Sequence, residues 1–524
     1  MRRLALLIVF NAAAARPASA QADRWWADVK ALAHDSMAGR QTGSVAHRKA
    51  AEFIAAAFRG AGLRPAGSDG YFQPVPFVVR TVDESKSHLA LLRDGAEQPL
   101  VLGEDASFAL RAPLAVRVDA PLVFAGYGLS IPELAHDDLA GLELKGSVVV
   151  YLSGSPRGLP GPVISHARSQ AWRAFQAAGA VGMIVVSPAR EGAAAYERGA
   201  RFRFAPQMAL DEPALDGQAG NQLSLTFNPG RAEKLFIGAA ETFAALASRA
   251  DSGLPLPHFA LPVRIRSSAR LLERRLLSDN VVGLLPGTDP ALANEYVVLT
   301  AHFDHVGIGP AVNGDSIYNG AMDNASGTAL LIDAARQLAG SSVRRHRSVL
   351  FVAVTAEEHG LLGSRWFANH PTVPGEALVA NLNTDMFLPF MPLKYVMVNG
   401  LEESNLADDA RRVGADQHIQ VMTDPEPEEN RFVRSDQYSF ILRGIPALSV
   451  KVGYTRDSPE HTIVREFRVK RYHLPSDDVD QPIDRQSAED FERYYVALVN
   501  EMANRSTRPS YNADSYFRKF APRR

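Results

Sequence analysis

Three strongly apolar segments separated by helical patterns constrain the fold of this 524-residue chain more than any other feature. The apolar segments lie at residues 296–300, 348–355 and 378–382, and the helical patterns between them lie at residues 325–338 and 360–370. Short apolar strands that alternate with helices are typical of a largely parallel sheet with helices on both sides. We therefore predict an α/β fold, a three-layer α/β/α sandwich around a mixed, mostly parallel sheet.

A second block of the sequence has its own pattern and predicts a separate module. Residues 120–265 contain short strands such as 121–128 and 145–151 around a helical stretch, which indicates a β-rich α/β insertion. This insertion divides the main domain into residues 21–119 and residues 266–507. We interpret the basic tail, residues 508–524, as a packed or frayed end and not as a binding element.

The first twenty residues are typical of an export signal. Arg2 and Arg3 precede an apolar run at residues 4–10, and Ala18-Ser19-Ala20 supplies small residues for cleavage. We expect cleavage after Ala20 and a periplasmic or secreted protein. No later stretch is apolar enough to cross a bilayer, so we expect no stable membrane anchor.

Composition limits the partners and the chemistry. The 56 Lys and Arg residues nearly balance the 58 Asp and Glu residues, so the chain has no general attraction for nucleic acid, and we predict no nucleic-acid partner. The chain contains no cysteine, which excludes disulfides, thiolate metal ligands and a cysteine nucleophile. Any metal must therefore be bound through nitrogen and oxygen atoms.

Acids and histidines follow the apolar strands at the points where each strand ends. A further histidine comes from a later loop. Because the carboxyl ends of parallel strands meet at one edge of a sheet, ligand sites form there. The residues that we expect to gather at this edge are His302, Asp304, Asp323, Glu357, Glu358, Asp385 and His473.

This inventory of side chains suits a two-metal hydrolytic centre. Two histidines and three carboxylates can hold two divalent ions only if one carboxylate bridges them, which leaves a position for a water molecule that becomes a hydroxide near neutral pH. A further carboxylate that is not a ligand must carry the proton to the leaving amine. Glu357, next to a candidate ligand, can take that role.

These motifs resemble the co-catalytic zinc aminopeptidase family, which also includes glutamate carboxypeptidase and glutaminyl cyclase relatives. The resemblance extends to residues 37–44 near the start of the chain and to the segment 280–287 before the first metal-site strand. Residues 120–265 are similar to the protease-associated domain that is often inserted into these enzymes.

The resemblance implies a role for each motif residue. It implies two Zn²⁺ ions, with Co²⁺ or Mn²⁺ as alternatives, and a cis peptide bond between Asp323 and Asn324. Glu357 corresponds to the general base, and Asp304 corresponds to the acid that orients His302. The implied ligands are Asp323 as the bridge, Glu358 and His473 for one ion, and His302 and Asp385 for the other.

Some positions depart from the family pattern or lie near it. Met322 and Gln437 stand where many relatives have an acid and a histidine that are not ligands. We name Gln437, Tyr454 and Arg434 as candidate substrate contacts, although a buried structural tyrosine is a strong alternative for Tyr454. We interpret the remaining histidines near the motifs as structural, namely His305, His359 and His461.

We therefore expect an exported zinc exopeptidase that acts on peptides, and among exopeptidases we expect an aminopeptidase. The alternatives are a carboxypeptidase, a glutaminyl-cyclase-like enzyme on the same scaffold and a non-catalytic binding ectodomain. The acids Asp424, Glu426, Glu428 and Glu429 would favour a protonated amino terminus if they line the entrance. Arg431 and Arg434 are the candidates for binding a terminal carboxylate. The sequence leaves the oligomeric state open.

Overall fold

The computed structural model describes residues 20–188 and 192–522. The predicted export signal lies outside these residues, except for Ala20 at the start of the first helix, α1 (Ala20–Leu32). Among the described residues, no helix combines the length and the apolar character that crossing a bilayer requires.

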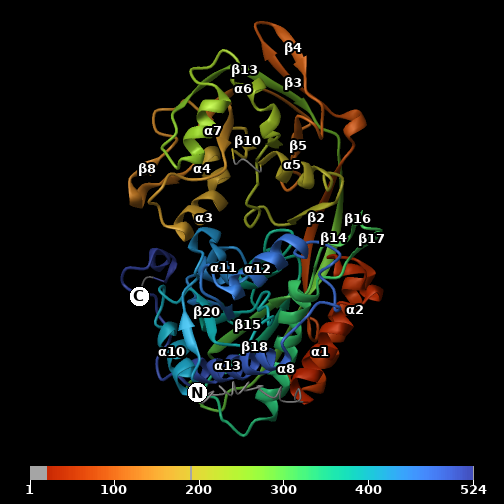
Figure 1. The fold of residues 1–524 in the computed structure, drawn as a ribbon, viewed down its shortest axis with the longest axis vertical. Coiled ribbons are helices and arrows are strands. Elements are labelled where there is room, and N and C mark those ends of the chain that lie inside the picture. The colour runs from red at the N-terminus through yellow and green to blue at the C-terminus, as the bar shows by residue number, and fades with distance from the viewer. Residues whose placement is uncertain (1–19, 189–191, 523–524) are drawn as a thin grey trace, which may run out of the picture.

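The chain forms an α/β structure built around a ten-stranded sheet in the lower half of Figure 1. Four central strands run parallel to one another: β18 (Ser348–Val354), β15 (Tyr296–His302), β19 (Leu378–Asn383) and β22 (Ala447–Gly453). Apart from Tyr296 at the start of β15, these strands are buried along their whole length, as expected for a sheet covered on both faces.

The flanks of this sheet are mostly antiparallel. On one side follow β14 (Leu271–Leu285), β2 (Phe72–Val82), β11 (Gln207–Leu210) and β1 (Arg64–Pro65), and on the other β20 (Tyr395–Asn399) and β21 (Gln420–Met422). Within the described residues, five of the nine strand pairs are antiparallel. The sheet is therefore mixed, and the expectation of a mostly parallel sheet holds only for its centre, because strands from distant parts of the chain join its flanks mostly in antiparallel orientation.

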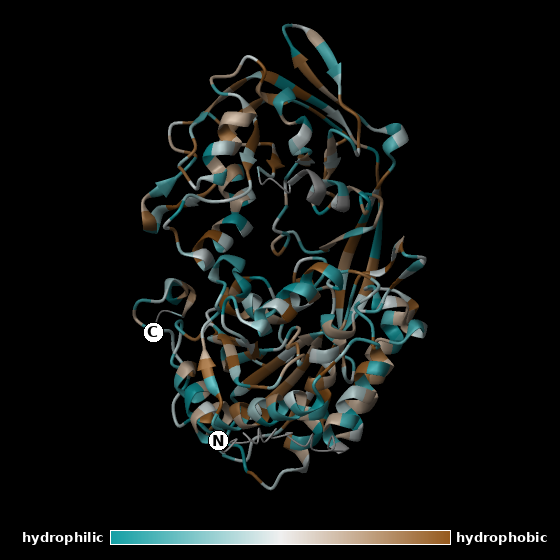
Figure 2. Cartoon of the chain, viewed as in Figure 1, coloured by the Kyte–Doolittle hydropathy of each residue, from teal (hydrophilic) through white to brown (hydrophobic). Residues whose placement is uncertain are grey.

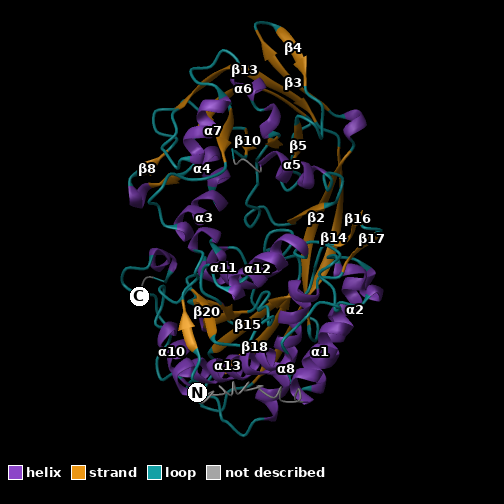
Figure 3. Cartoon of the chain, in the orientation of Figure 1, coloured by secondary structure: helices purple, strands orange, loops and turns teal. Residues whose placement is uncertain are grey.

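Helices cover both faces of the sheet (Figure 3). On one face, alternate residues such as Val297, Leu299 and Phe351 belong to the largest apolar core. The helices that contribute to this core include α1, α2 (Val45–Gly60), α8 (Ser326–Gly340), α10 (Leu406–Asp416) and α13 (Arg485–Asn504). On the other face, Val298 and Leu350 pack with residues of α9 (Leu362–Asn369) and α11 (Gln437–Ile441).

Residues 88–268 form a second unit around an eight-stranded sheet, in the upper half of Figure 1. Its strands in spatial order are β4 (Ala96–Pro99), β3 (His88–Arg93), β13 (His258–Ser268), β6 (Arg117–Ala125), β9 (Val148–Leu152), β10 (Gly182–Val186), β12 (Leu223–Phe227) and β5 (Ala106–Phe108). Separate apolar clusters lie on the two faces of this sheet, and Figure 2 shows apolar strands in both units.

The boundaries of this second unit differ from the predicted range of 120–265. Strands β3, β4 and β5 precede residue 120 and pair within the second sheet, whereas β11 lies inside the range and pairs with β2 of the large sheet. The long pair β2 and β14, in register from Leu271 opposite Val82 to Val281 opposite Phe72, connects the two units. Such pairing between distant segments leaves no local mark in the sequence.

Candidate metal centre and adjoining pocket

The predicted site residues come together at the carboxyl ends of the central parallel strands. His302 is the last residue of β15, Glu357 and Glu358 follow β18, and Asp385 follows β19. Asp323 lies in a short non-helical turn directly before α8, and His473 follows α12 (Pro459–Lys470). The peptide bond between Asp323 and Asn324 is cis, as the family resemblance implies.

Asp323 joins two groups of candidate ligands through its two carboxylate oxygens. His302 Nε2 lies 3.3 Å from Asp323 Oδ1 and 3.6 Å from Asp385 Oδ1. His473 Nε2 lies 3.1 Å from Asp323 Oδ2 and 3.2 Å from Glu358 Oε2. Each oxygen of Asp323 therefore faces a different group.

These donors suit divalent zinc. Ligands about 2.0–2.1 Å from a tetrahedral ion are separated by about 3.3 Å, which agrees with the spacings in both groups. Asp385 Oδ1 is also buried without a hydrogen-bond donor from the described residues, a costly state for a carboxylate that no cation neutralises. Nitrogen and carboxylate oxygen are ordinary zinc ligands, so His302, Asp323, Glu358, Asp385 and His473 can hold such ions.

The electrostatics of the isolated side chains point the same way. Burial alone would raise the pKa of Asp323, but the histidines around it hold that pKa well below the usual range. Burial alone would lower the pKa of His473, but Glu358 and Asp323 raise it well above its usual value. The carboxylates thus remain charged and favour cations beside them. When metal is absent, the protonated histidines are these cations.

Glu357 and Glu358 are adjacent in sequence but have different surroundings. The Glu358 carboxylate contacts His473 and His305, whereas the Glu357 carboxylate forms no hydrogen bond or ion pair with any residue of the described chain. Burial, with the negative charges of Glu358 and Asp385, raises the pKa of Glu357 well above its usual range. A free carboxylate with a raised pKa at the rim of the centre is suited to proton transfer.

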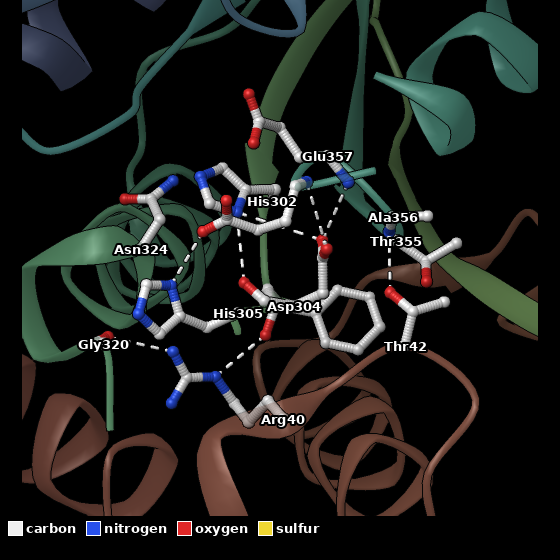
Figure 4. A network of polar contacts seen from close by, with 12 residues as sticks. Arg40, Thr42, His302, Asp304, His305, Gly320, Asn324, Thr355, Ala356 and Glu357 are labelled. Carbon is white, nitrogen blue, oxygen red and sulfur yellow. Dashed lines mark hydrogen bonds and ion pairs between the residues drawn. The ribbon is translucent and has the colours of Figure 1, made fainter. Parts of the chain in front are cut away.

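Asp304 positions the two glutamates more directly than it positions His302 (Figure 4). Its carboxylate accepts hydrogen bonds from the backbone N–H groups of Glu357, at 3.0 Å, and Glu358, at 3.3 Å. His302 Nδ1 lies 3.2 Å from the backbone oxygen of Asp304 but 3.9 Å from its carboxylate. The predicted orientation of His302 by Asp304 therefore runs through the main chain. Burial raises the pKa of Asp304 to about 6.

Arg40 connects the loops behind the centre and was not identified as a site residue from the sequence. Its guanidinium is fully buried and donates hydrogen bonds of 2.7–2.9 Å to the backbone oxygens of Leu32, Phe303, Asn319 and Gly320. Phe303 follows His302, and Gly320 precedes the turn with Asp323. Arg40 belongs to the motif 37–44, but its role depends on contacts that the sequence does not show.

Two further polar side chains fix the turn that carries Asp323. The carboxylate of Asp477, four residues after His473, accepts hydrogen bonds from the N–H groups of Met322 and Asp323 at 3.0 Å. Asn324 donates to the Thr384 oxygen and accepts from the Met386 N–H group, which ties this turn to the loop of Asp385. The relative positions of the ligands are thus set by a network of buried hydrogen bonds.

His305, predicted to be structural, lies against the candidate ligands. Its Nδ1 lies 2.8 Å from Glu358 Oε1 and 3.9 Å from Asp323 Oδ2, so it belongs to the same group of potential ligands as His473. Its other ring nitrogen, Nε2, is buried and has no hydrogen-bond partner within the part of the chain that the structure describes.

A cavity of about 210 Å³ opens beside the centre. Its wall near the centre includes Asp323, Glu357, Asp385 and His473, and its apolar lining includes Met386, Leu388, Met397, Val464 and Phe467. Because pockets for drug-sized ligands span about 300–1,000 Å³, this cavity suits one side chain of a substrate.

Most of the charged residues on the far wall of this cavity are cations. They are Arg431, Arg434, Lys451 and Arg468, against one acid, Glu429, among the described residues that line it beyond the centre. Arg468 and Arg434 both face Glu429, at 3.1 and 3.7 Å. Arg431 is bound to Asp424 and Glu426. Lys451 forms no hydrogen bond or ion pair with a described residue.

The acidic run at residues 424–429 does not present free charge at the entrance. Arginines compensate all four acids, since Glu428 contacts Arg456 and the other three face the arginines of the cavity wall. This pairing removes the Coulomb argument that the run attracts a protonated amino terminus.

The three predicted substrate contacts have different positions. Gln437 is fully buried, donates to the backbone oxygens of Arg431 and Phe432 and accepts from Asn383, so it is a structural residue and not a substrate contact. Tyr454 lines the cavity, but its hydroxyl is bound to Glu426 at 2.5 Å and to Arg431 at 3.1 Å. Arg434 lines the cavity with a largely exposed side chain.

Two histidines predicted as structural lie outside the group of ligands. His461 bonds to Glu426 and accepts from the Asp457 N–H group, which supports a structural role. Burial lowers the pKa of His359 to about 4, so this side chain is neutral at ordinary pH.

Comparison with known proteins agrees with this geometry. Residues 280–499 match peptidase family M28, and this segment contains all seven predicted metal-site residues. The chain is similar to the probable leucine aminopeptidase 2 of Aspergillus fumigatus, 33% identical over 176 residues that cover 32% of each chain. It is also similar to aminopeptidase Y of Saccharomyces cerevisiae, 27% identical over 208 residues, covering 38% of this chain and 35% of that one. The matches thus span about a third of the length of these curated relatives.

The fold as a whole has a counterpart among solved structures. An aminopeptidase from Aneurinibacillus sp. strain AM-1 aligns with a TM-score of 0.53 and 18% identity, covering 93% of this chain and 95% of that one. This similarity extends through both units. With the family match, it confirms the predicted resemblance to the co-catalytic zinc aminopeptidase family, and residues 280–499 of this chain match peptidase family M28.

Proposed function

We propose that this protein is an exported zinc aminopeptidase that uses two metal ions. The observation that carries the proposal is the division of the Asp323 carboxylate between two groups, with Oδ1 toward His302 and Oδ2 toward His473. A single-metal, cyclase-like site needs no such shared acid. The conversion of the scaffold to a non-catalytic ectodomain would not preserve both groups together with the free Glu357.

The residues of the chain define a mechanism. His302 and Asp385 would hold one zinc ion, Glu358 and His473 the other, and Asp323 both. Bound there, zinc would polarise the peptide carbonyl and acidify a water molecule. Glu357, whose carboxylate is free, would accept the proton of the attacking water and transfer it to the leaving amine. Asp304 would hold the Glu357 backbone in place through its N–H group.

The second unit, within residues 88–268, is proposed to be a protease-associated domain that shapes access to the cavity. Its support is positional. Helix α3 (Gly161–Ser169) of this unit packs on the segment Arg431–Val433, whose first residue lines the cavity, while none of the seven predicted metal-site residues lies in the unit. Export, with cleavage after Ala20, is proposed from the pattern of the first twenty residues.

Hydrolysis of chromogenic amino-acid amides tests the proposed function. The purified protein should release the chromophore, lose this activity on dialysis against a strong chelator and regain it with zinc or cobalt. A peptide acetylated at its amino end should resist cleavage, and a peptide amidated at its carboxyl end should be cut. Cleavage of the acetylated peptide only would assign the protein to the carboxypeptidases, and full activity without metal would exclude the mechanism.

A further inference from the structure

We propose that the cavity beside the metal centre is an anion-binding specificity pocket in which Lys451 binds a carboxylate of the substrate. The inference rests on the proposed function, because it assigns a substrate class to the same site. It concerns a residue that the proposed mechanism does not use.

The first observation is the position of Lys451. It lies near the end of β22, where Leu448 and Val450 point into the main core, and Ser449 and Lys451, on the opposite face of the strand, line the cavity. The residue is only 8% exposed. Burying an ammonium group this deeply is costly unless a negative charge compensates it.

The second observation is that the protein supplies no direct partner. No acceptor among the described residues lies within hydrogen-bond or ion-pair distance of Lys451. The neighbouring arginines do have partners, since Arg431 is bound to Asp424 and Glu426, and Arg468 to Glu429. Lys451 is therefore the surplus cation of the cavity.

The third observation concerns the charges that act on Lys451 from a distance. The acids with the strongest effect on it are Asp385 and Asp323, both candidate metal ligands. Two divalent cations carry one more charge than the three ligand carboxylates neutralise. With metals bound, Lys451 thus loses its distant counter-charge, and an anion that enters the cavity would restore it.

The chemistry of the cavity restricts what this anion is. Beyond the metal centre, its walls combine apolar side chains with the cationic side chains, Glu429, two serines and two tyrosines, and its volume suits one side chain. A short aliphatic chain that ends in a carboxylate matches both features, with the methylene groups against Phe467 and Leu388 and the carboxylate at Lys451. Two sources supply such a group: the side chain of an amino-terminal Glu or Asp, or the terminal carboxylate of a substrate bound in the opposite direction.

Kinetics with matched substrates test the proposal. We compare kcat/KM for the 4-nitroanilides of glutamate and its neutral isostere glutamine, in the wild type and in Lys451→Met. We expect the ratio for glutamate over glutamine to fall about 10- to 100-fold in the variant, as for a lost charge-assisted hydrogen bond. Lys451→Arg should keep part of the preference. Lys470→Met, which removes an exposed lysine from α12, should leave the ratio unchanged.

Two further experiments complete the test. One distinguishes the two sources of the carboxylate, and the other measures binding without turnover. N-acetylated dipeptides with a free or an amidated carboxyl end replace the nitroanilides: dependence of the free acid on Lys451 would identify the terminal carboxylate as the ligand. Calorimetric binding of glutamate and glutamine to Glu357→Gln protein with metal supplies a readout that needs no turnover, and glutamate should bind more tightly.

The outcomes are distinct from those of the proposed function. If the wild type hydrolyses no amide or peptide with metal present, the proposed function fails. If it hydrolyses neutral substrates but the wild type shows no preference for a carboxylate of either source, the anion pocket is wrong. An equal preference in wild type and Lys451→Met, with metal content and thermal unfolding unchanged, would also overturn the assignment to Lys451.

Discussion

At the scale of single residues, the adjacent pair Glu357 and Glu358 shows how environment divides two identical side chains into two roles. Glu358 is held by two histidines, and Glu357 is free. We predict that Glu357→Gln keeps its bound zinc and loses activity by about 10² to 10⁴-fold, the usual contribution of general acid–base catalysis. Glu358→Gln should lose metal. Measuring the zinc content and kcat of both variants checks this division of roles. Equal metal loss in the two variants would contradict it.

The residue types of the metal centre were predictable, because each acid or histidine follows a strand or motif that the sequence displays. The environment of each residue was not. Gln437 was predicted to contact the substrate because it stands where many relatives have a histidine, yet its side-chain amide is hydrogen-bonded to Arg431, Phe432 and Asn383. Lys451 is the one charged residue in the segment Ala447–Gly453, which the sequence shows. Its burial, which gives this charge its meaning, is seen only in the structure.

At the scale of elements, Arg40 ties three parts of the chain to the loops of the metal centre. Arg40→Met would leave four buried backbone oxygens without their donor, and we predict a loss of about 3 kcal/mol or more in the free energy of unfolding. Zinc affinity should also fall, about 10- to 100-fold, as for other residues behind metal ligands.

The free energy of unfolding is measured with a denaturant for Arg40→Met and for a control variant, Arg48→Met. Arg48 is half exposed and pairs with Glu52 and Asp279, so its loss should cost about 1 kcal/mol or less. If Arg40→Met lowers the free energy of unfolding no more than Arg48→Met does, the buried guanidinium of Arg40 does not support the loops.

The strands around the metal centre could be predicted where the local sequence pattern determines the secondary structure. The predicted strands 296–300, 348–355 and 378–382 match β15, β18 and β19 to within two residues, because each is a short apolar run that ends at a polar loop. The antiparallel flanks and the early start of the second sheet were not predicted. They depend on pairings such as β2 with β14, whose partners lie about 200 residues apart and share no local signal.

At the scale of the whole molecule, the two units meet at a buried histidine of the second unit. His166 of α3 contacts the Tyr438 hydroxyl at 2.6 Å, and its ring packs against Tyr516, Phe517 and Phe520 of the carboxyl-terminal segment. Lys519 of this segment reaches Glu133 of the second unit at 2.7 Å. The predicted tail thus packs between the units over its described part.

This junction predicts a pH dependence of stability. Burial lowers the pKa of His166 to about 4 from the ordinary 6.5, so the unfolded chain binds more protons between these values. The contribution of neutral His166 to the free energy of unfolding is complete above pH 6.5. It is lost as the pH falls toward 4, by at most about 3 kcal/mol. His166→Gln should flatten the fall in unfolding free energy between pH 7 and 4.5.

Urea unfolding at several pH values checks the junction, with the exposed His258→Gln as control. Burial also lowers the pKa of His47, to about 3, but this effect is common to all three proteins and cancels in the comparison. An identical pH dependence in wild type and His166→Gln would show that the junction does not respond to protonation of His166.

The central claim is that the Asp323 carboxylate is shared between two zinc ions. Anomalous diffraction at the zinc absorption edge, on crystals of the zinc-loaded protein, tests it most directly. The account predicts two peaks, one between His302, Asp323 and Asp385 and the other between Asp323, Glu358 and His473. A single peak, or peaks that Asp323 does not contact, in crystals of protein that hydrolyses its substrate would contradict it.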